Sequence, residues 1–513
     1  MSIRWGQRVE LFYTTKAHLE RTIFVEGAPF ECGEFVSCLP PLARTVLFDK
    51  SIPEGMPFFL DSNGEYMKDL NEFLLSLPSD GCPSPHTWQA YAKDIFLFVR
   101  FLREYRARYD VFQATRDDLR HYYRARLLSE QDALKPSSWN RGIRALEKLY
   151  VWAISKGIRT TVPFTYKDAT ENLPRHVHQR SRARNNAIVR AGDTDTIKCV
   201  SLDEYLIFRD VGLLGLTPDG HPDPAFRGRN GLRNAAFAEL LISTGIRLEE
   251  AGSLLCPELP DPHASKWNGF EACKLQLGRK ITKGNKGRSV WIPKRVLTDS
   301  ILPYVQESRD NAVAKAQDNG TYQELTNLIP VKGWFSEGAI LQNNRSPSRV
   351  AFDDLTLQER ARLYSVDSTG SANNPCLLWT NEQGLPVGPP NFTIIFARAC
   401  ERLRSRFNLR VHITPHTLRH TFAVYMLNHL VRETIGTLAH LKGERITLGE
   451  QLYRRVISDP LRTLQRLLGH SSIATTYVYL TYIEETERLI DTAIGSWGNR
   501  LGRPSDWQPG VAH

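Results

Sequence analysis

Apolar residues recur at the spacing of an α-helix between Ser84 and Lys156. They form two runs, Tyr91, Ile95, Phe98 and Leu102, then Trp139, Ile143, Leu146, Tyr150 and Ala153. Between the runs, Thr115 resembles an N-cap, because Asp117 and Asp118 would lie in the first helical turn. We therefore predict a small helical bundle in this part of the chain.

From about Cys199 to the end, the pattern is again mainly helical, with one clear strand segment. Apolar and polar residues alternate over Lys274 to Pro293, on both sides of a turn rich in glycine and asparagine at 284–287. This pattern is typical of a β-hairpin. The first 80 residues contain only short strand-like runs, at Thr22 to Val25 and Thr45 to Phe48. The chain is therefore predicted to be mainly α with a small β-hairpin or sheet, an α+β fold.

A chain of 513 residues is too long for one ordinary core, so two or three domains are expected. The pattern separates an N-terminal extension of unclear role, a helical domain, a basic linker and a large C-terminal domain, at residues 1–80, 81–172, 173–198 and 199–513. Two stretches of the last domain, near 309–374 and 428–458, resemble insertions.

Charge points to a polyanionic partner. The net charge is +10 and the sequence pI is about 9.1, which is weak evidence alone, because many basic proteins bind no nucleic acid. The linker segment from Arg175 to Arg184 is too basic to be buried. It is either simply solvated or lies along phosphates as well, through Arg180, Arg182 and Arg184.

The remaining composition excludes several classes of protein. The eight cysteines are scattered without a C-x-x-C pair, which predicts reduced structural thiols rather than a zinc site. The first residues lack the apolar region of a signal peptide, and the strongest apolar cluster, Ile95 to Leu102, is too short to span a bilayer. We expect a soluble, cytoplasmic protein that needs no metal or other cofactor.

The segment T-P-H-T-L-R-H, Thr414 to His420, predicts an anion site. Thr414 is a good N-cap and Pro415 suits the first helical position, which places His416 and Arg419 on one face near the positive end of a helix. Taken alone, a histidine and an arginine on a helix are more often structural.

The segment T-G-I-R-L-E-E-A, Thr244 to Ala251, predicts a helix that stops at Gly245 and a second helix that begins near Arg247. Glu250 lies one turn further on and could orient Arg247, although a surface ion pair is the simpler interpretation of this pair alone. The hairpin turn adds Lys283, Lys286 and Arg288. These side chains could be merely solvated, or they could reach into a DNA groove.

The segment L-L-G-H-S-S-I-A-T-T-Y-V-Y, Leu467 to Tyr479, supplies a candidate nucleophile. Gly469 ends one helix, His470 follows in the turn, and the next helix carries the tyrosines. Helical spacing puts Tyr477 on the apolar face and leaves Tyr479 freer to act, with Tyr482 as a rival. A phenol with a pKa of about 10 is a poor nucleophile, so nearby cations are required.

The order of these motifs resembles that of the tyrosine recombinases, also called the phage-integrase family. The four motifs are T-G-I-R-L-E-E-A, T-K-G-N-K-G-R, H-T-L-R-H-T-F and L-G-H-S-S-I-A-T-T-Y-V-Y. The resemblance covers roughly residues 85–495 and implies that the helical domain is a core-binding (SAM-like) DNA-binding domain. It departs from the compact family pattern at the two insertions and at the first 80 residues.

The resemblance implies a role for each matching residue. Tyr479 would attack the scissile phosphodiester and form a 3′-phosphotyrosine link, while Arg247 and Arg419 hold the phosphate. Glu250 and His420 would support the two arginines, and Lys283 would be the general acid. His416 and His470 would hydrogen-bond the phosphate or help to move the tyrosine proton. Lys286 and Arg288 would contact the DNA.

The resemblance also implies partners. These are duplex DNA with attachment sites, a homotetramer on that DNA, and accessory DNA-bending or partner recombinase proteins, with integration or excision of a mobile element in the bacterial nucleoid as the setting. A relaxing topoisomerase with the same chemistry, or a catalytically idle DNA-binding regulator, remains an alternative.

Overall fold

The computed structural model describes residues 10–13, 23–25, 28–30, 52, 56–61, 66–82, 84–129, 133–167, 184–189, 198–342, 347–441 and 459–482. The chain divides into two compact units, Met1–Thr196 and Ile197–His513. Among the described helices, none is both long and apolar enough to cross a membrane.

The first unit is built on helices that pack around one apolar core. The helices are α3 (Lys68–Ser76), α4 (Pro85–Arg106), α5 (Arg116–Leu127) and α6 (Pro136–Ser155). Four short strands form an antiparallel sheet in the order β3-β2-β1-β4, with bounds Glu10–Tyr13, Ile23–Val25, Ala28–Phe30 and Pro57–Leu60 for β1 to β4. The strands β5 (Tyr166–Lys167) and β6 (Arg184–Asn185) form a separate pair.

This core begins before residue 81. Phe73 of α3 lies edge-on to Trp152 of α6, with ring centroids 5.8 Å apart, and Phe59 of β4 belongs to the same buried cluster. Part of the predicted N-terminal extension is therefore packed with the helices, because its apolar residues complete their core. β2 lies within the strand-like run predicted at Thr22 to Val25, whereas Thr45 to Phe48 lies outside the described residues.

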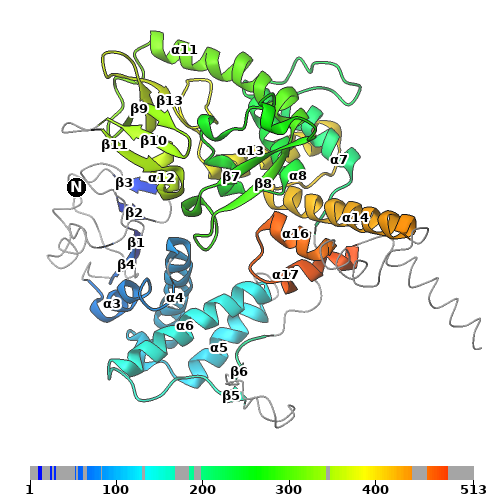
Figure 1. Ribbon diagram of the computed structural model, residues 1–513. Helices are drawn as coiled ribbons and strands as arrows, with labels where there is room; N and C mark the ends of the chain where they lie inside the picture. The colour runs from blue at the N-terminus through cyan, green and yellow to red at the C-terminus, as the bar shows by residue number, and fades with distance from the viewer. Residues whose placement is uncertain are drawn as a thin grey trace, which may run out of the picture. The chain divides into compact units, whose positions relative to one another are not determined.

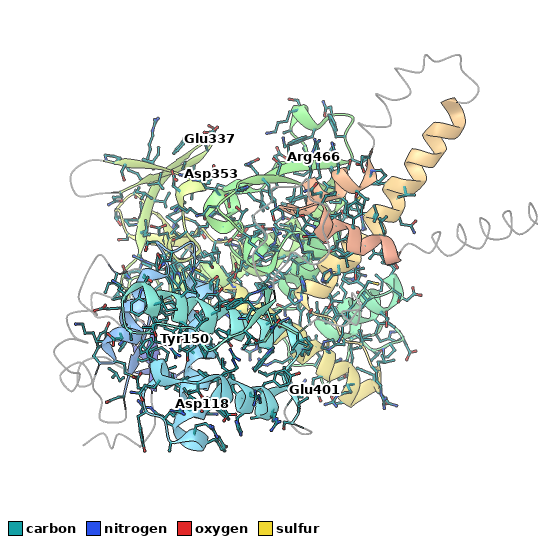
Figure 2. The ribbon with its side chains drawn as sticks, turned by 90° about the horizontal axis from the view of Figure 1, so that it is seen from below. Asp118, Tyr150, Glu337, Asp353, Glu401 and Arg466 are labelled. Carbon is teal, nitrogen blue, oxygen red and sulfur yellow. The ribbon has the colours of Figure 1, made fainter. Side chains whose placement is uncertain are left out.

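The start of α5 shows how local sequence and packing agree. Thr115 accepts a hydrogen bond from the backbone N–H of Asp118, and the Asp118 carboxylate accepts one from the Thr115 N–H at 2.8 Å, so the two form a capping box. Asp118 is fully buried and also pairs with Arg106 and Arg108, with N–O distances of 2.8 and 2.7 Å. Figure 2 labels Asp118 and Tyr150 among these helices.

The second unit surrounds the buried helix α8. Its α- and π-helices before the five-stranded sheet described below are α7 (Leu202–Ile207), a π-helix (Phe208–Leu213), α8 (Gly231–Thr244), α9 (Leu248–Gly252), α10 (Lys294–Val296), two more π-helices (Leu297–Ile301 and Tyr304–Arg309) and α11 (Asp310–Asp318). Those that follow are α12 (Leu357–Ala361), α13 (Pro389–Phe407), α14 (Pro415–Leu441), α16 (Pro460–Leu468), α17 (Ala474–Tyr477) and a 3-10 helix (Val478–Tyr482). In Figure 1, α14 is the long gold helix and α16 and α17 lie below it.

The predicted hairpin is present. Strands β7 (Ala272–Leu277) and β8 (Arg288–Pro293) are antiparallel, with Leu275 opposite Val290, and both of these residues are buried. The connection has a 3-10 turn at Arg279–Ile281 before the glycine-rich tip, where Gly284 and Asn285 have φ of +80° and +54°. Glycine and asparagine are the residues that adopt this left-handed conformation most easily, which is the reason for the turn at this point.

The predicted insertion at 309–374 is a packed part of the second unit. It contains a five-stranded sheet in the order β11-β10-β9-β12-β13, with bounds Ile329–Phe335, Gly338–Leu341, Ser348–Ala351, Leu363–Val366 and Ala372–Pro375 for β9 to β13. A fully buried arginine, Arg360, ties it to the preceding chain through an ion pair with Glu258 at 2.6 Å. Figure 2 labels Glu337 and Asp353 in this part.

The second predicted insertion, 428–458, is described only in part. Helix α14 continues through its first residues to Leu441, and residues 442–458 lie outside the described part. The described chain resumes at Asp459, which is the N-cap of α16. Asp459 accepts a hydrogen bond from the Leu461 N–H at 2.9 Å at the start of α16.

Asp118→Ala tests the ion-pair cluster of the first unit. It removes one buried partner of two arginines and the N-cap partner of α5, so we expect the unfolding free energy to fall by about 3–5 kcal/mol. The measurement is urea denaturation of the full chain. The matched control is Asp117→Ala, because Asp117 is half-exposed and its ion pairs should contribute less than about 1 kcal/mol. Equal effects from the two substitutions would contradict this account.

Candidate active site

Two left-handed glycine turns form the base of the candidate site. Gly245 ends α8 and Gly469 ends α16, each with φ of +62°. At Gly245 a side chain would also collide with Phe422, whose nearest ring carbon would lie 2.3 Å from the added Cβ. Both turns therefore require glycine, and they hold backbone carbonyl groups toward the arginines described next.

The Glu250 carboxylate organises two of these arginines. It is fully buried and accepts hydrogen bonds from the Arg247 backbone N–H at 2.9 Å, from Arg247 Nη1 at 3.0 Å and from Arg288 Nη2 at 2.6 Å. Burial alone would raise its pKa, but Arg288 and Arg247 outweigh that effect and lower the pKa of Glu250. The predicted orientation of Arg247 by Glu250 is therefore what the structure shows.

Arg419 completes the group from helix α14. The predicted N-cap holds, since Thr414 accepts a hydrogen bond from the Thr417 N–H at 3.1 Å. Arg419 is 4% exposed and donates to the carbonyls of Gly245 and of Leu468, the latter at 2.6 Å. Burial, then repulsion by Arg247 and Arg288, lowers the pKa of Arg419 to about 9.

The charge balance of this group favours an anion. Arg247, Arg288 and Arg419 contribute three positive charges, and Glu250 contributes one negative charge. Burying cations without enough counter-charge is unfavourable, so a phosphate placed beside Arg247 and Arg419 would stabilise the arrangement. Arg247 keeps a side-chain exposure of 26%, which leaves part of its guanidinium open to such a ligand.

Arg288 differs from its predicted placement as a DNA contact on the turn. Its side chain is only 11% exposed and is directed inward, where it pairs with Glu250 and donates to the Leu467 carbonyl at 2.6 Å. The reason is the strand register: Arg288 shares the inward face of β8 with Val290 and Ile292. It also packs so closely against Gly469 that an added Cβ would lie 2.5 Å from its Cδ.

Tyr479 lies beside these arginines and is only 3% exposed. Burial raises the pKa of Tyr479, while Arg419 and Arg247 act in the opposite direction. Its hydroxyl is hydrogen-bonded to Nδ1 of His420 at 2.9 Å, and Nε2 of His420 is 2.9 Å from Nε2 of His416. The candidate nucleophile is thus in contact with His420, which in turn contacts His416 on the same face of α14.

His470 lies on another side of Tyr479. The two rings are stacked with centroids 6.2 Å apart, and Nδ1 of His470 is 3.0 Å from the hydroxyl of Thr476. Thr476 is fully buried, so it fixes the His470 ring, a role that the sequence pattern did not reveal. Burial, then Arg419, lowers the pKa of His470 to about 4.

The burial that helical spacing predicted for the two tyrosines is wrong. Tyr477 is 51% exposed and Tyr479 is buried, the reverse of the prediction. The α-helix ends at Tyr477 after four residues and continues as a 3-10 helix, so a spacing of 3.6 residues per turn does not apply across both tyrosines. Tyr479 nevertheless is the tyrosine that contacts the histidines.

The structure describes no contact between the predicted lysines and the arginines or tyrosine of this site, and it leaves two of the linker arginines undescribed. Lys283 and Lys286 are exposed on the β7–β8 connection. Arg180 and Arg182 lie outside the described residues, and Arg184 belongs to the first unit, in β6. In the part of the chain that is described, no three His, Cys, Asp or Glu side chains are placed to hold a metal ion.

Glu250→Gln tests whether the carboxylate charge holds the arginines. The substitution keeps the shape and removes the charge that two guanidinium groups share, so the unfolding free energy should fall by about 3–5 kcal/mol. Urea denaturation of the full chain measures this, with exposed Glu249→Gln as the neighbouring control. A loss for Glu250→Gln no larger than that of the control would show that the charge is unimportant.

Comparison with known proteins finds similar sequences. Residues 70–157 match the model of the phage integrase N-terminal SAM-like domain. The chain is 31% identical over 142 residues to tyrosine recombinase XerC of Mesorhizobium japonicum, an alignment that spans 28% of this chain and only 33% of that relative's length. It is 21% identical over 421 residues to tyrosine recombinase XerD of Halalkalibacterium halodurans, across 82% of this chain and 94% of that relative.

Solved structures are similar at lower identity. One is the XerH site-specific recombinase bound to a palindromic difH substrate, with 12% identity, a TM-score of 0.44 and coverage of 84% of this chain and 85% of that chain. Another is the Tn1549 transposon integrase with circular intermediate DNA, with 13% identity, a TM-score of 0.41 and coverage of 80% and 95%. Residues 70–157 are thus similar to the SAM-like domain of phage integrases, and most of the chain is similar in sequence to a tyrosine recombinase.

Proposed function

We propose that this chain is a site-specific DNA recombinase that cleaves and rejoins duplex DNA through a 3′-phosphotyrosine intermediate at Tyr479. Similarity to tyrosine recombinases supports DNA breaking and rejoining as the activity. The observation that carries the assignment to Tyr479 is its position: the hydroxyl is hydrogen-bonded to His420, and Arg419 and Arg247 oppose the rise in its pKa that burial causes.

The arginine group is of the right size for this chemistry. At pH 7, ionising a phenol of ordinary pKa costs about 4 kcal/mol. Charge-assisted hydrogen bonds contribute about 1.5–3 kcal/mol each, so two arginines on the attacked phosphate offset that cost. In this proposal Arg247 and Arg419 bind the non-bridging oxygens, Glu250 and Arg288 hold Arg247 in place, and His470 contacts the phosphate.

Lys283 is proposed as the general acid that protonates the leaving 5′-oxygen. It is exposed on the glycine-rich connection between β7 and β8, where its long side chain can reach a bound duplex. The covalent phosphotyrosine link conserves the energy of the broken bond, so rejoining needs no nucleotide cofactor. Lys286 at the same tip, together with Arg180, Arg182 and Arg184 of the linker, is proposed to contact the DNA backbone.

The assembly follows from the reaction. Exchange between two duplexes breaks four strands, and each break uses one tyrosine, so we propose a homotetramer on two attachment sites. Accessory DNA-bending or partner recombinase proteins belong to the same proposal. The proposed setting is integration or excision of a mobile element in bacterial cytoplasm, on nucleoid DNA.

Tyr479→Phe tests the nucleophile. Duplexes that bind the full chain are selected from a random pool, a nick is introduced, and the protein–DNA adduct that resists denaturation is measured. The wild type should form the adduct, and Tyr479→Phe should form none while binding DNA normally, because only the hydroxyl is lost. Tyr477→Phe, at the exposed neighbouring tyrosine, is the matched control and should react like the wild type.

The outcomes separate the alternatives. Strand exchange between two sites indicates a recombinase, and plasmid relaxation without exchange indicates a topoisomerase. DNA binding without an adduct from the wild type would indicate the idle regulator and overturn the enzymatic proposal. An adduct that persists in Tyr479→Phe would move the nucleophile to another tyrosine.

Salt dependence tests the proposed backbone contact at the hairpin tip. Each phosphate neutralised by a lysine contributes a slope of about −0.9 to log affinity against log salt concentration. Lys286→Ala should therefore make the slope shallower by about one, measured by fluorescence anisotropy on the selected duplex. The control is Lys315→Ala, an exposed lysine on α11, which should leave the slope unchanged. An unchanged slope for Lys286→Ala would remove this residue from the DNA interface.

A further inference from the structure

The contact of the Tyr479 hydroxyl assigns a proton acceptor. Its hydrogen bond is to Nδ1 of His420, at 2.9 Å, and among the described residues the hydroxyl has no other hydrogen-bond partner. His470, which is stacked on the Tyr479 ring, has its Nδ1 engaged by Thr476 instead. The group in position to receive the phenolic proton is therefore His420.

The second contact of His420 continues the path outward. Its Nε2 faces Nε2 of His416 at 2.9 Å, and the two imidazole centroids are 4.1 Å apart. Two such nitrogens can form a hydrogen bond only if one carries the proton and the other accepts it. If the tyrosine donates to Nδ1 of His420, then Nε2–H of His420 donates to His416, and His416 carries its own proton on Nδ1.

In that arrangement the Tyr479 hydroxyl and Nε2–H of His420 each donate a hydrogen bond to an acceptor. The reverse tautomers would make His420 donate to the tyrosine oxygen and leave the phenolic O–H without an acceptor among the described residues. An unsatisfied hydroxyl in a buried site costs about 1–3 kcal/mol, so the outward-directed arrangement is favoured.

We propose that His420 is the catalytic base that accepts the Tyr479 proton, and that His416 passes a proton from it to solvent. This inference rests on the proposed function. In the cleavage step the bond between Tyr479 Oη and phosphorus forms and the bond between phosphorus and the 5′-oxygen breaks. The phenolic proton moves to Nδ1 of His420, the proton on Nε2 of His420 moves to Nε2 of His416, and His416 releases its Nδ1 proton to water.

Electrostatics explain why two histidines serve better than one. Burial, then His416 and Arg419, lowers the pKa of His420 to about 4, so His420 is neutral at pH 7 and poor at keeping a positive charge. Partial burial, then Arg419 and Arg247, also lowers the pKa of His416, so His416 does not retain the proton, and its exposed position lets the proton pass to water. The other ionisable groups around the pair are Arg247 before α9, Glu250 on α9, Arg288 on β8, and His470 and Tyr479 after α16.

The experiment measures single-turnover adduct formation by the full chain on the nicked, selected duplex across about pH 6 to 9. His420→Asn keeps an atom near the Nδ1 position for the tyrosine contact but cannot accept a proton. We expect a rate about 10²–10⁴-fold lower at neutral pH, with DNA affinity and thermal unfolding unchanged. The same substitution at His429, an exposed histidine on α14, is the matched control and should have no effect.

The pH profile distinguishes a chemical role from a structural one. The wild-type rate should change little above about pH 6, because His420 is already neutral. The rate of His420→Asn should rise about tenfold per pH unit, because only the ionised tyrosine then attacks. His420→Gln, which keeps an atom near Nε2 instead, should show the same slope and serves as the second variant if the first does not fold.

The experiment distinguishes failure of the proposed function from failure of the role assigned to His420. A wild-type chain without any adduct would overturn the proposed function itself. A wild-type adduct together with a His420→Asn rate near that of the wild type would overturn only the role of His420. A slow variant whose pH profile runs parallel to that of the wild type would also overturn it, because His420 would then act through structure alone.

Discussion

The buried carboxylate of Glu250 is the interaction on which the rest of the candidate site depends. It joins Arg247 at the start of α9 to Arg288 on β8, and Arg288 in turn holds the carbonyl of Leu467 before the Gly469 turn. One negative charge thus connects three segments that are far apart in the sequence. Because the carboxylate is inaccessible to water, losing it would leave two guanidinium groups without their partner.

A second constraint follows from the surplus of positive charge around Glu250. The group contains three arginines and this one acid. The pKa of Arg419 is lowered to about 9, because Arg419 is buried near the other two arginines and its contacts are neutral backbone carbonyls. Tyr479 is placed in the same field. Burial opposes ionisation of its hydroxyl and the arginines favour it; burial is the larger effect, so the pKa of Tyr479 is raised.

The sequence allowed the main parts of this site to be predicted, because several depend on local rules. The N-cap at Thr414, the glycine stops at 245 and 469, and the hairpin all follow from residue types at fixed spacing. The order of the motifs then gave the resemblance to the tyrosine recombinases, and the similar proteins include members of that family. The helical domain was also predicted, although its core extends further toward the N-terminus, since apolar residues of β4 and α3 complete it.

Tertiary packing decided what sequence patterns could not. Arg288 is charged and adjoins a turn, which favours exposure, yet the register of β8 directs it inward. The change from α-helix to 3-10 helix after Tyr477 reversed the expected burial of the two tyrosines. The polar stretch at 309–374 was expected to be an insertion, and buried arginines such as Arg360 integrate it into the fold.

If Tyr479 is the nucleophile, its hydroxyl oxygen forms the covalent bond to the DNA phosphate. Peptide mapping of the trapped adduct tests this most directly. The wild-type adduct is digested with protease and nuclease, and the modified peptide is sequenced by mass spectrometry. The account predicts a nucleotide joined through its 3′-phosphate to Tyr479. A nucleotide on Tyr477, on Tyr482 or on a residue other than tyrosine, or a link through a 5′-phosphate, would contradict it.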